Sequence, residues 1–238
     1  MAEANWTVLG SSVALGNVRR GVTAGTTPPS GGGTYVYGFN SVAAVTGTVG
    51  LYTNQANFIP TAKGGSIRAA VRRGTSASPT GFSPFLYVGL QGTSISDNGY
   101  MLGLSDAAPA NLVLRKGALS EGIVDGETGD EGILAKSTDT FDEGTWYHLR
   151  LDMIVNPSGD VILRVYQNDL TANAVSAPVW AAVDGMDAET DGAAFVDDAL
   201  GVNSGSLPFA TGYMGYGFQV DGLSRRSYFD HIECLRQI

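Results

Sequence analysis

The sequence predicts an all-β protein, an antiparallel β-sandwich, and three observations support this class. Apolar side chains recur at every second position in one segment after another, which is the period of a strand with one buried face. Thirty-three glycines in 238 residues supply frequent turns between these segments. No long run carries the 3.6-residue period of a helix. Without crossover helices the strands pair antiparallel, so the sheets stack face to face.

The first 33 residues differ in composition from the rest. Trp6 to Leu9 is a short predicted strand, and Gly21 to Gly33 holds two prolines and five glycines. Such a run is either a linker that attaches the domain to something larger or an ordinary surface loop, and the sequence leaves both open. We assign residues 1–33 to an N-terminal arm and residues 34–238 to the sandwich domain.

From residue 34 onward, predicted strands alternate with turn signals. The ten segments are Thr34–Phe39, Val45–Tyr52, Ser66–Arg72, Pro84–Leu90, Gly99–Leu104, Asn111–Lys116, Trp146–Val155, Val161–Gln167, Tyr213–Val220 and Ser227–Leu235. The best helical candidates are the short runs Pro178–Val183 and Ala193–Leu200. The last segment is expected to close the domain.

The stretch from Gly144 to Gln167 predicts a hairpin whose register follows from its faces. A slip of one residue would send every side chain to the wrong side, so the apolar faces must coincide. The predicted pairs are Val155 with Val161, Met153 with Leu163, Leu151 with Val165, Asp152 with Arg164, and Arg150 with Tyr166. The connection then spans Asn156 to Asp160. Leu149, Leu151 and Leu163 should point into the core, with an ion pair and a cation–aromatic pair on the other face.

Charge and composition exclude several functions. The net charge of −9, with only three lysines, opposes binding to the phosphates of nucleic acids. No apolar stretch is long enough to predict a membrane span, so no membrane insertion is expected. The start of the chain lacks the basic and apolar blocks of a signal peptide, and we expect synthesis in a cytosol. The single cysteine, Cys234, excludes an internal disulfide.

Several short motifs resemble those of concanavalin A-like lectin/glucanase and laminin-G-like domains. They are the Gly-x-Trp opening of the strand Trp146–Leu151, the pair Phe85–Leu90 and Gly99–Leu104, and the final run Ser227–Ile232. The resemblance covers residues 34–238. It implies a jelly roll of two curved antiparallel sheets, with ligands on the concave face or at the loops of one rim. Many members bind glycans and some cleave them.

The composition also resembles that of bacteriophage virion proteins: it is rich in Gly, Ala and Thr, poor in lysine, and has a short leading arm without an export signal. This likeness implies a non-enzymatic structural protein of a phage tail, fibre or capsid surface, located in the virion. Its partners would be other virion proteins and copies of itself in a symmetric oligomer, with host glycan as a ligand during adsorption. Two alternatives remain open: a carbohydrate-active enzyme or free carbohydrate-binding module, and an assembly protein without a ligand.

The predicted glycan site comprises Asp97, Asn98, Tyr100 and Trp180. Asp97 and Asn98 offer short polar side chains at a tight turn beside an aromatic residue, although turn chemistry explains them equally well. An aromatic face such as that of Trp180 suits the apolar side of a pyranose, but is also compatible with a place in the core.

One acidic run mimics a calcium loop. Asp187, Glu189 and Asp191 occupy positions 1, 3 and 5, a glycine follows, and Asp198 stands at position 12. The run departs from the pattern because Glu replaces the usual residue at position 3, Asp replaces the bidentate Glu, and no helices flank it. A solvated acidic loop is the alternative. No other cofactor is expected.

Catalysis is not predicted. Asp230 and Glu233 have a spacing that places them on opposite faces of a strand, and Asp152 is paired in the predicted register. A Tyr/His/Arg set of the kind used by lyases is approached by Tyr147, His148 and Arg150, but Tyr147 faces away from the other two.

Overall fold

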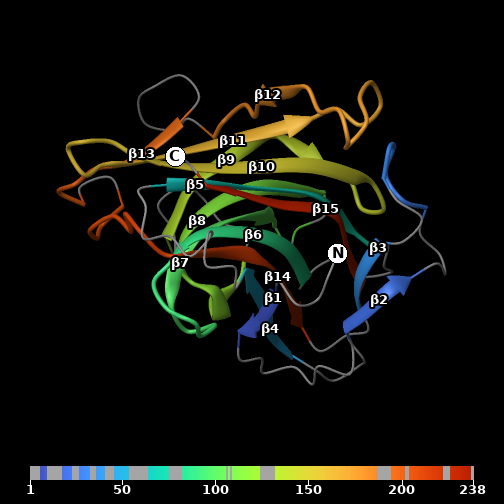
Figure 1. Ribbon diagram of the computed structural model, residues 1–238, viewed down its shortest axis with the longest axis horizontal. Coiled ribbons are helices and arrows are strands. Elements are labelled where there is room, and N and C mark those ends of the chain that lie inside the picture. The colour runs from blue at the N-terminus through green and yellow to red at the C-terminus, as the bar shows by residue number, and fades with distance from the viewer. Residues whose placement is uncertain are drawn as a thin grey trace.

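The protein is a sandwich of two stacked antiparallel sheets, seen in the computed structural model in Figure 1. The structure describes residues 6–9, 18–22, 27–32, 36–40, 46–53, 64–74, 82–105, 107, 109–123, 132–186, 194–201, 204–221 and 226–236. Every strand pairing in this part of the chain is antiparallel. The predicted fold class is therefore confirmed.

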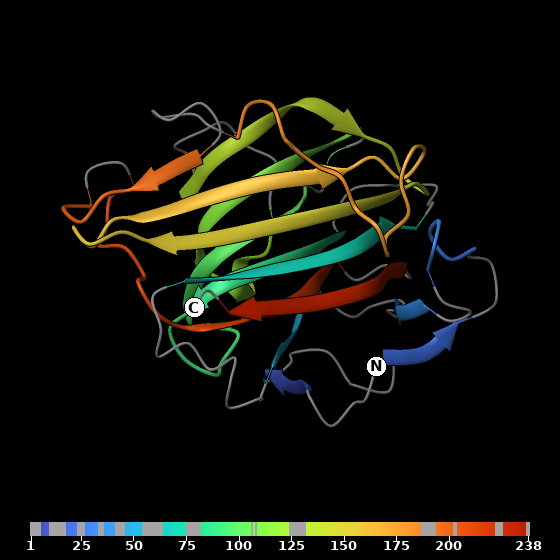
Figure 2. The ribbon, with the colours of Figure 1, turned by 45° about the horizontal axis from the view of Figure 1, so that its top comes forward.

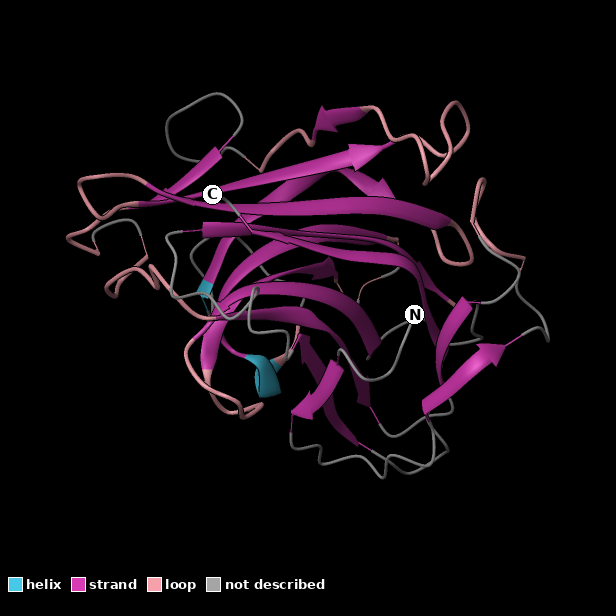
Figure 3. Cartoon of the chain, viewed as in Figure 1, coloured by secondary structure: helices cyan, strands magenta, loops and turns pink. Residues whose placement is uncertain are grey.

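The seven-stranded sheet has the order β1-β4-β14-β6-β7-β8-β9. Its strands are β1 (Trp6–Leu9), β4 (Thr46–Thr53), β14 (Tyr213–Asp221), β6 (Phe82–Leu90), β7 (Asn98–Leu104), β8 (Ala110–Ala118) and β9 (Ile133–Phe141). A single turn of 3₁₀ helix, η3 (Leu119–Glu121), follows β8. Strands dominate the described residues, as Figure 3 shows, and no helix among them is long and apolar enough to cross a membrane.

The eight-stranded sheet has the order β12-β11-β10-β5-β15-β3-β2, with β13 also paired to β11. Its strands are β12 (Trp180–Ala182), β11 (Val161–Asn168), β10 (Trp146–Val155), β5 (Gly64–Arg73), β15 (Arg226–Arg236), β3 (Val36–Asn40), β2 (Val18–Val22) and β13 (Ala194–Asp197). Figure 2 shows how β11, β10, β5 and β15 lie side by side across the front of the molecule.

The core lies between the two sheets and follows the alternation of the strands. Leu149, Leu151 and Leu163 are each at most 1% exposed and belong to one apolar cluster with Leu102 and Leu114 of the opposite sheet. Each fully buried Leu contributes about 1.5–3 kcal/mol relative to an exposed one. The prediction that these leucines point into the core is confirmed.

The predicted hairpin register is confirmed in every pair, from Val155 with Val161 to Arg150 with Tyr166. The connection spans Asn156 to Asp160, and the backbone N–H of Asn156 donates to the carbonyl of Asp160 at 3.0 Å. The Arg150 guanidinium lies 5.3 Å from the centre of the Tyr166 ring, as expected for the cation–aromatic pair. The ion pair differs from the prediction and is described below.

All ten predicted strands are present, but both helical candidates were wrong. The run Pro178–Val183 contains β12, and Ala193–Leu200 contains β13; both short strands pair with β11. Backbone pairing to an existing strand edge stabilises these segments, whereas a helix this short would lack sufficient packing. Strand β9 was not predicted, because its sequence ILAKSTDTF interrupts the apolar alternation with polar residues.

Two segments from the predicted arm lie within the sheets. Strand β1 pairs with β4, and β2 pairs with β3. Residues 27–32 also pack on the domain: Pro29 is buried, and the carbonyl of Ser30 accepts the N–H of Val175 at 2.9 Å. The division of the chain at residue 33 stays a prediction.

Candidate functional site

The eight-stranded sheet carries its polar and aromatic side chains on the face that points away from the core, here called the outer face. The alternation that buries Leu149 and Leu151 turns their strand neighbours outward. The outer face comprises Arg68 and Arg72 of β5, Trp146, His148, Arg150 and Asp152 of β10, Arg164, Tyr166 and Asn168 of β11, Trp180 of β12, and Tyr228, Asp230 and Glu233 of β15. The expectation that Asp230 and Glu233 lie on opposite faces was wrong, because the register of β15 shifts between them.

Two carboxylates of the outer face are held by arginines. Arg150 donates to Asp152 through two bonds, Nε to Oδ1 at 2.7 Å and Nη2 to Oδ2 at 2.6 Å. Arg68 donates to Glu233 Oε2 from Nε at 3.0 Å and from Nη2 at 2.5 Å. The predicted ion pair of Asp152 with Arg164 was wrong in its partner: the two residues face each other in register, but Asp152 binds the arginine two positions away on its own strand.

His148 is fully buried although it belongs to the outer face. Its ring lies 4.6 Å from the Trp180 ring and 6.1 Å from the His231 ring, centre to centre. Burial lowers the pKa of His148 to about 3, and the charges of His231 and Arg68 act in the same direction. The imidazole is therefore neutral at physiological pH, and its buried Nε2 has no hydrogen-bond partner.

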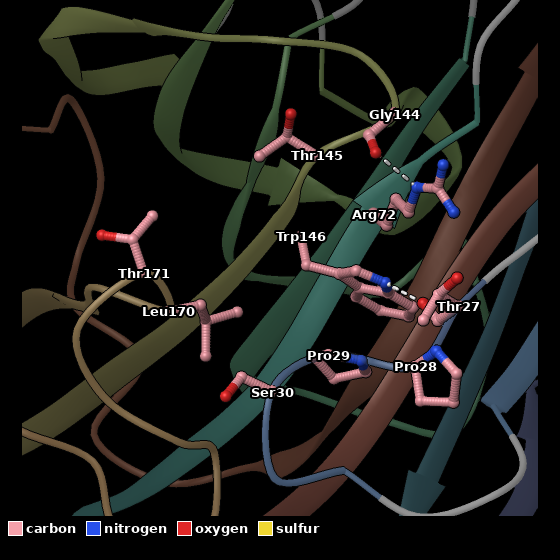
Figure 4. A pocket seen from close by; sticks show the side chains of 10 residues that line it. All are labelled: Thr27, Pro28, Pro29, Ser30, Arg72, Gly144, Thr145, Trp146, Leu170 and Thr171. Carbon is pink, nitrogen blue, oxygen red and sulfur yellow. Dashed lines mark hydrogen bonds between the residues drawn. The ribbon is translucent and has the colours of Figure 1, made fainter.

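A pocket of about 670 Å³ opens on the outer face beside Trp146 (Figure 4). Its ten lining residues come from the segment 27–30, from Arg72 of β5, from residues 144–146 and from the connection after β11. Trp146 donates from Nε1 to the carbonyl of Thr27 at 2.7 Å, and Arg72 donates from Nε to the carbonyl of Gly144 at 2.7 Å. These two bonds hold the indole and the guanidinium in fixed orientations, and none of the lining residues is acidic.

The residues of the predicted glycan site are not brought together. Asp97 lies in the turn before β7, where its Oδ2 accepts the N–H of Ser94 at 2.8 Å, and Asn98 is the exposed first residue of β7. Tyr100 is fully buried and donates its hydroxyl to Asp197, so its ring offers no face to a ligand. Burial, together with Asp197, raises the pKa of Tyr100 well above its ordinary value. Of the four, Trp180 alone lies on the outer face.

Three of the predicted calcium ligands, Asp187, Glu189 and Asp191, lie outside the described residues. Asp198 is described, and its Oδ1 accepts the N–H of Leu200 at 3.0 Å. Within the part of the chain that the structure describes, no group of three or more His, Cys, Asp or Glu residues is arranged to hold a metal ion. Calcium at the acidic run stays a prediction.

A buried polar cluster centred on Lys116 was not predicted. Lys116 Nζ donates to Asp197 Oδ2 at 2.7 Å, to Ser204 Oγ at 2.8 Å and to the carbonyls of Ser206 and Leu207 at 2.8 and 3.0 Å. The Lys116 and Asp197 side chains are only 4% and 0% exposed. The cluster ties β8 to β13 and to the loop before β14. Little in the sequence predicts this cluster, apart from the fact that Lys116 is one of only three lysines.

The pocket was not predicted either, because it forms from segments that are distant in sequence. The sequence predicts that Trp146 opens a strand and that the run near Pro28 is a linker or a surface loop, but no local pattern indicates that the two meet. A hydrogen bond across 119 positions creates this contact.

The sequence matches no protein-family model, and no curated protein matches it. Solved structures do match. The marine PL-14 alginate lyase from Aplysia kurodai superposes with a TM-score of 0.57 at 10% identity, over 97% of this chain and 90% of that one. A mutant carbohydrate recognition domain of Emp46p gives 0.50 at 13% identity over 99% and 90%, and the carbohydrate-binding module CBM66 from Bacillus subtilis gives 0.48 at 11% over 98% and 96%. The superposition on the alginate lyase and the two stacked antiparallel sheets show that the chain has the concanavalin A-like β-sandwich fold.

Proposed function

We propose that this chain is a non-enzymatic carbohydrate-binding protein of a bacteriophage particle, and that it binds glycan in the pocket beside Trp146. The observation that carries the proposal is the pocket itself, where an indole and a guanidinium, both fixed by hydrogen bonds, stand among exposed hydroxyls. Its volume of about 670 Å³ lies in the range of small-molecule sites.

The chemistry of the pocket suits a sugar ring. An indole face packs on the apolar side of a pyranose, and hydroxyl groups exchange hydrogen bonds with its rim. Ser30, Thr145 and Thr171 are exposed at the edge of the pocket and supply such hydroxyls. Since Trp146 is already held by the carbonyl of Thr27, little side-chain freedom is lost on binding.

The pairing of carboxylates on the outer face supports binding without cleavage. Glycoside hydrolysis needs two carboxyl groups, one of them protonated near neutral pH through a raised pKa. Asp152 and Glu233 each accept hydrogen bonds from an arginine, so neither carboxyl group is available to act on a substrate. His148 accepts a hydrogen bond on Nδ1 from Asn168, so that nitrogen is not free to take a proton from a substrate.

A polysaccharide lyase is the second candidate, and one observation favours it. His148 of β10 and Tyr166 of β11 lie on the same face of adjacent strands, together with Arg150. Tyr166 can therefore complete the Tyr/His/Arg set of a lyase, whereas Tyr147 faces away from the other two residues. A depolymerisation assay separates the two functions. Product release that is lost in both His148→Gln and Tyr166→Phe would replace the binding proposal with an enzymatic one.

The placement in a phage particle rests on composition: three lysines and abundant glycine. A symmetric oligomer would present several pockets together, and multivalency would strengthen weak glycan binding by orders of magnitude. Detection of the chain in purified particles, with host adsorption reduced by antibodies against it, tests the placement. Its absence from such particles would contradict it.

Glycan-array binding tests the pocket with a matched pair of variants. Trp146→Ala should weaken binding at least about tenfold, because stacking on the ring is lost. Trp180→Ala makes the same change on the same face outside the pocket, and should leave binding within about twofold of the wild type. A wild-type protein that binds no glycan would overturn the proposal. Loss of binding in Trp180→Ala alone would move the site to Trp180.

A further inference from the structure

The pocket contains a positive charge that no carboxylate of the described chain neutralises. We propose that the glycan bound there is acidic, and that Arg72 holds its carboxylate while Trp146 stacks on the sugar ring. The inference rests on the proposed function and specifies its ligand class.

Arg72 differs from the other arginines whose ion pairs the structure describes. Arg68, Arg73, Arg115 and Arg150 each lie against a carboxylate: Glu233, Glu143, Glu121 and Asp152, respectively. Arg72 instead donates from Nε to the carbonyl of Gly144, and its guanidinium lies 5.8 Å from the centre of the Tyr228 ring. Neither contact neutralises its charge. A partly buried cation without a counter-ion gains more from an anionic ligand than a paired one does.

The geometry of Arg72 allows a bidentate hydrogen bond to a carboxylate. A guanidinium presents its donors in a planar fork that matches a carboxylate. The Arg72 Nε bond to Gly144 fixes the plane of the guanidinium and leaves the two terminal nitrogens for a ligand. In Figure 4 the guanidinium and the indole of Trp146 line the same pocket.

Arg72 and Trp146 are also direct cross-strand partners of β5 and β10. Partners of this kind have Cβ atoms about 4.5–5.5 Å apart. This distance lets a single sugar residue reach both groups: its ring lies on the indole, and its carboxylate lies on the guanidinium. A uronic or sialic acid has this combination of a ring and an attached carboxylate.

The local charge supports this ligand class in a chain whose net charge is −9. Of the ten residues that line the pocket, Arg72 is charged and none is acidic. Charges that lie far from the pocket act only weakly on it in physiological salt, where the screening length is about 8 Å. The pocket can therefore attract an anion that the molecule as a whole repels.

The test compares the binding of acidic polysaccharides with the binding of their neutral, carboxyl-reduced forms. Alginate, polygalacturonate, hyaluronan and polysialic acid are each presented to the wild-type protein beside a carboxyl-reduced form. We expect at least one acidic polymer to bind at least about tenfold more tightly than its reduced form, as charge-assisted bonds are lost on reduction. Arg72→Gln should remove this preference. Arg164→Gln, which deletes the same charge from the same face outside the pocket, should keep it.

Each outcome separates this inference from the proposed function. Equal binding to an acidic polymer and its reduced form, or binding of neutral glycans alone, would refute the acidic ligand and leave glycan binding intact. No binding to any of these polymers or to a glycan array would overturn both. If Arg72→Gln does not fold, the salt dependence of the wild type decides: binding that is unchanged between low and high salt would contradict a carboxylate on Arg72.

Discussion

The side-chain amide of Asn168 donates from Nδ2 to Nδ1 of His148 at 3.2 Å. The amide is oriented by a second bond, because Asn168 Oδ1 accepts the backbone N–H of Val179 at 2.9 Å. The amide nitrogen can only donate, so Nδ1 of His148 must be the unprotonated nitrogen. The proton of the neutral imidazole then lies on Nε2, the buried atom without a partner. A neutral histidine is thus built into the outer face.

This neutral histidine predicts a pH-dependent stability. The pKa of His148 is about 3 in the folded protein, below the 6.5 of an unperturbed histidine, so the unfolded chain binds the extra proton between these values. Stability should fall as the pH drops through this window, by up to about 1.4 kcal/mol per pH unit. Urea unfolding of the wild type and His148→Gln at about pH 7, 6, 5 and 4 measures the effect. The variant should lose stability less steeply, and parallel curves would contradict the prediction.

The buried pair of Lys116 and Asp197 predicts a large loss of stability when one partner is removed. Lys116→Met leaves the Asp197 carboxylate buried without its counter-charge, and the free energy of unfolding should fall by about 3–5 kcal/mol. Glu233→Gln is the matched control, because the Arg68–Glu233 pair is partly exposed and should contribute less than about 1 kcal/mol. Chemical denaturation gives both values. Similar losses in the two variants would show that burial does not set the strength of these pairs.

Two glycines of one loop predict different costs for the same substitution. Gly201 and Gly205 have nearly the same φ, 73° and 71°, so alanine is strained at either by about 1–2 kcal/mol. A Cβ on Gly205 meets nothing within 4 Å, whereas a Cβ on Gly201 would lie 2.7 Å from the backbone of Ser206. Gly201→Ala should therefore lower the midpoint of thermal unfolding more than Gly205→Ala does. Equal shifts would contradict the structure of this loop.

The strand pattern was predictable from sequence because it is local. Alternation sets the face of each residue, and the hairpin register followed from matching two faces separated by a short turn. Strand β9 was not predicted because it lies at the edge of its sheet, where the consecutive residues Thr138, Asp139 and Thr140 are exposed and need not be apolar. Strand β13 was not predicted because a segment of four residues is too short for its apolar periodicity to distinguish a strand from a helical turn.

The candidate site was much less predictable, because burial there depends on contacts between distant segments. From its local sequence Tyr100 is predicted to be a surface aromatic residue beside a turn. In the structure its hydroxyl donates to Asp197, 97 positions later, and its ring is buried. From its local sequence His148 is predicted to point outward from a strand. In the structure Trp180 of the edge strand β12 packs on its ring, and the side chain is buried. Alternation gives the side of the sheet on which a residue lies, but not what covers that side.

One interior strand of each sheet comes from the last part of the described chain. Strand β14 lies between β4 and β6 in one sheet, and β15 lies between β5 and β3 in the other. While the ribosome is still making residues 213–236, each half-built sheet keeps unpaired backbone edges that can recruit other nascent chains. Neither sheet can therefore be completed before residues 213–236 have been synthesised. High-level expression at warm temperatures should favour inclusion bodies, and slower translation or a bound chaperone should raise the yield of native protein.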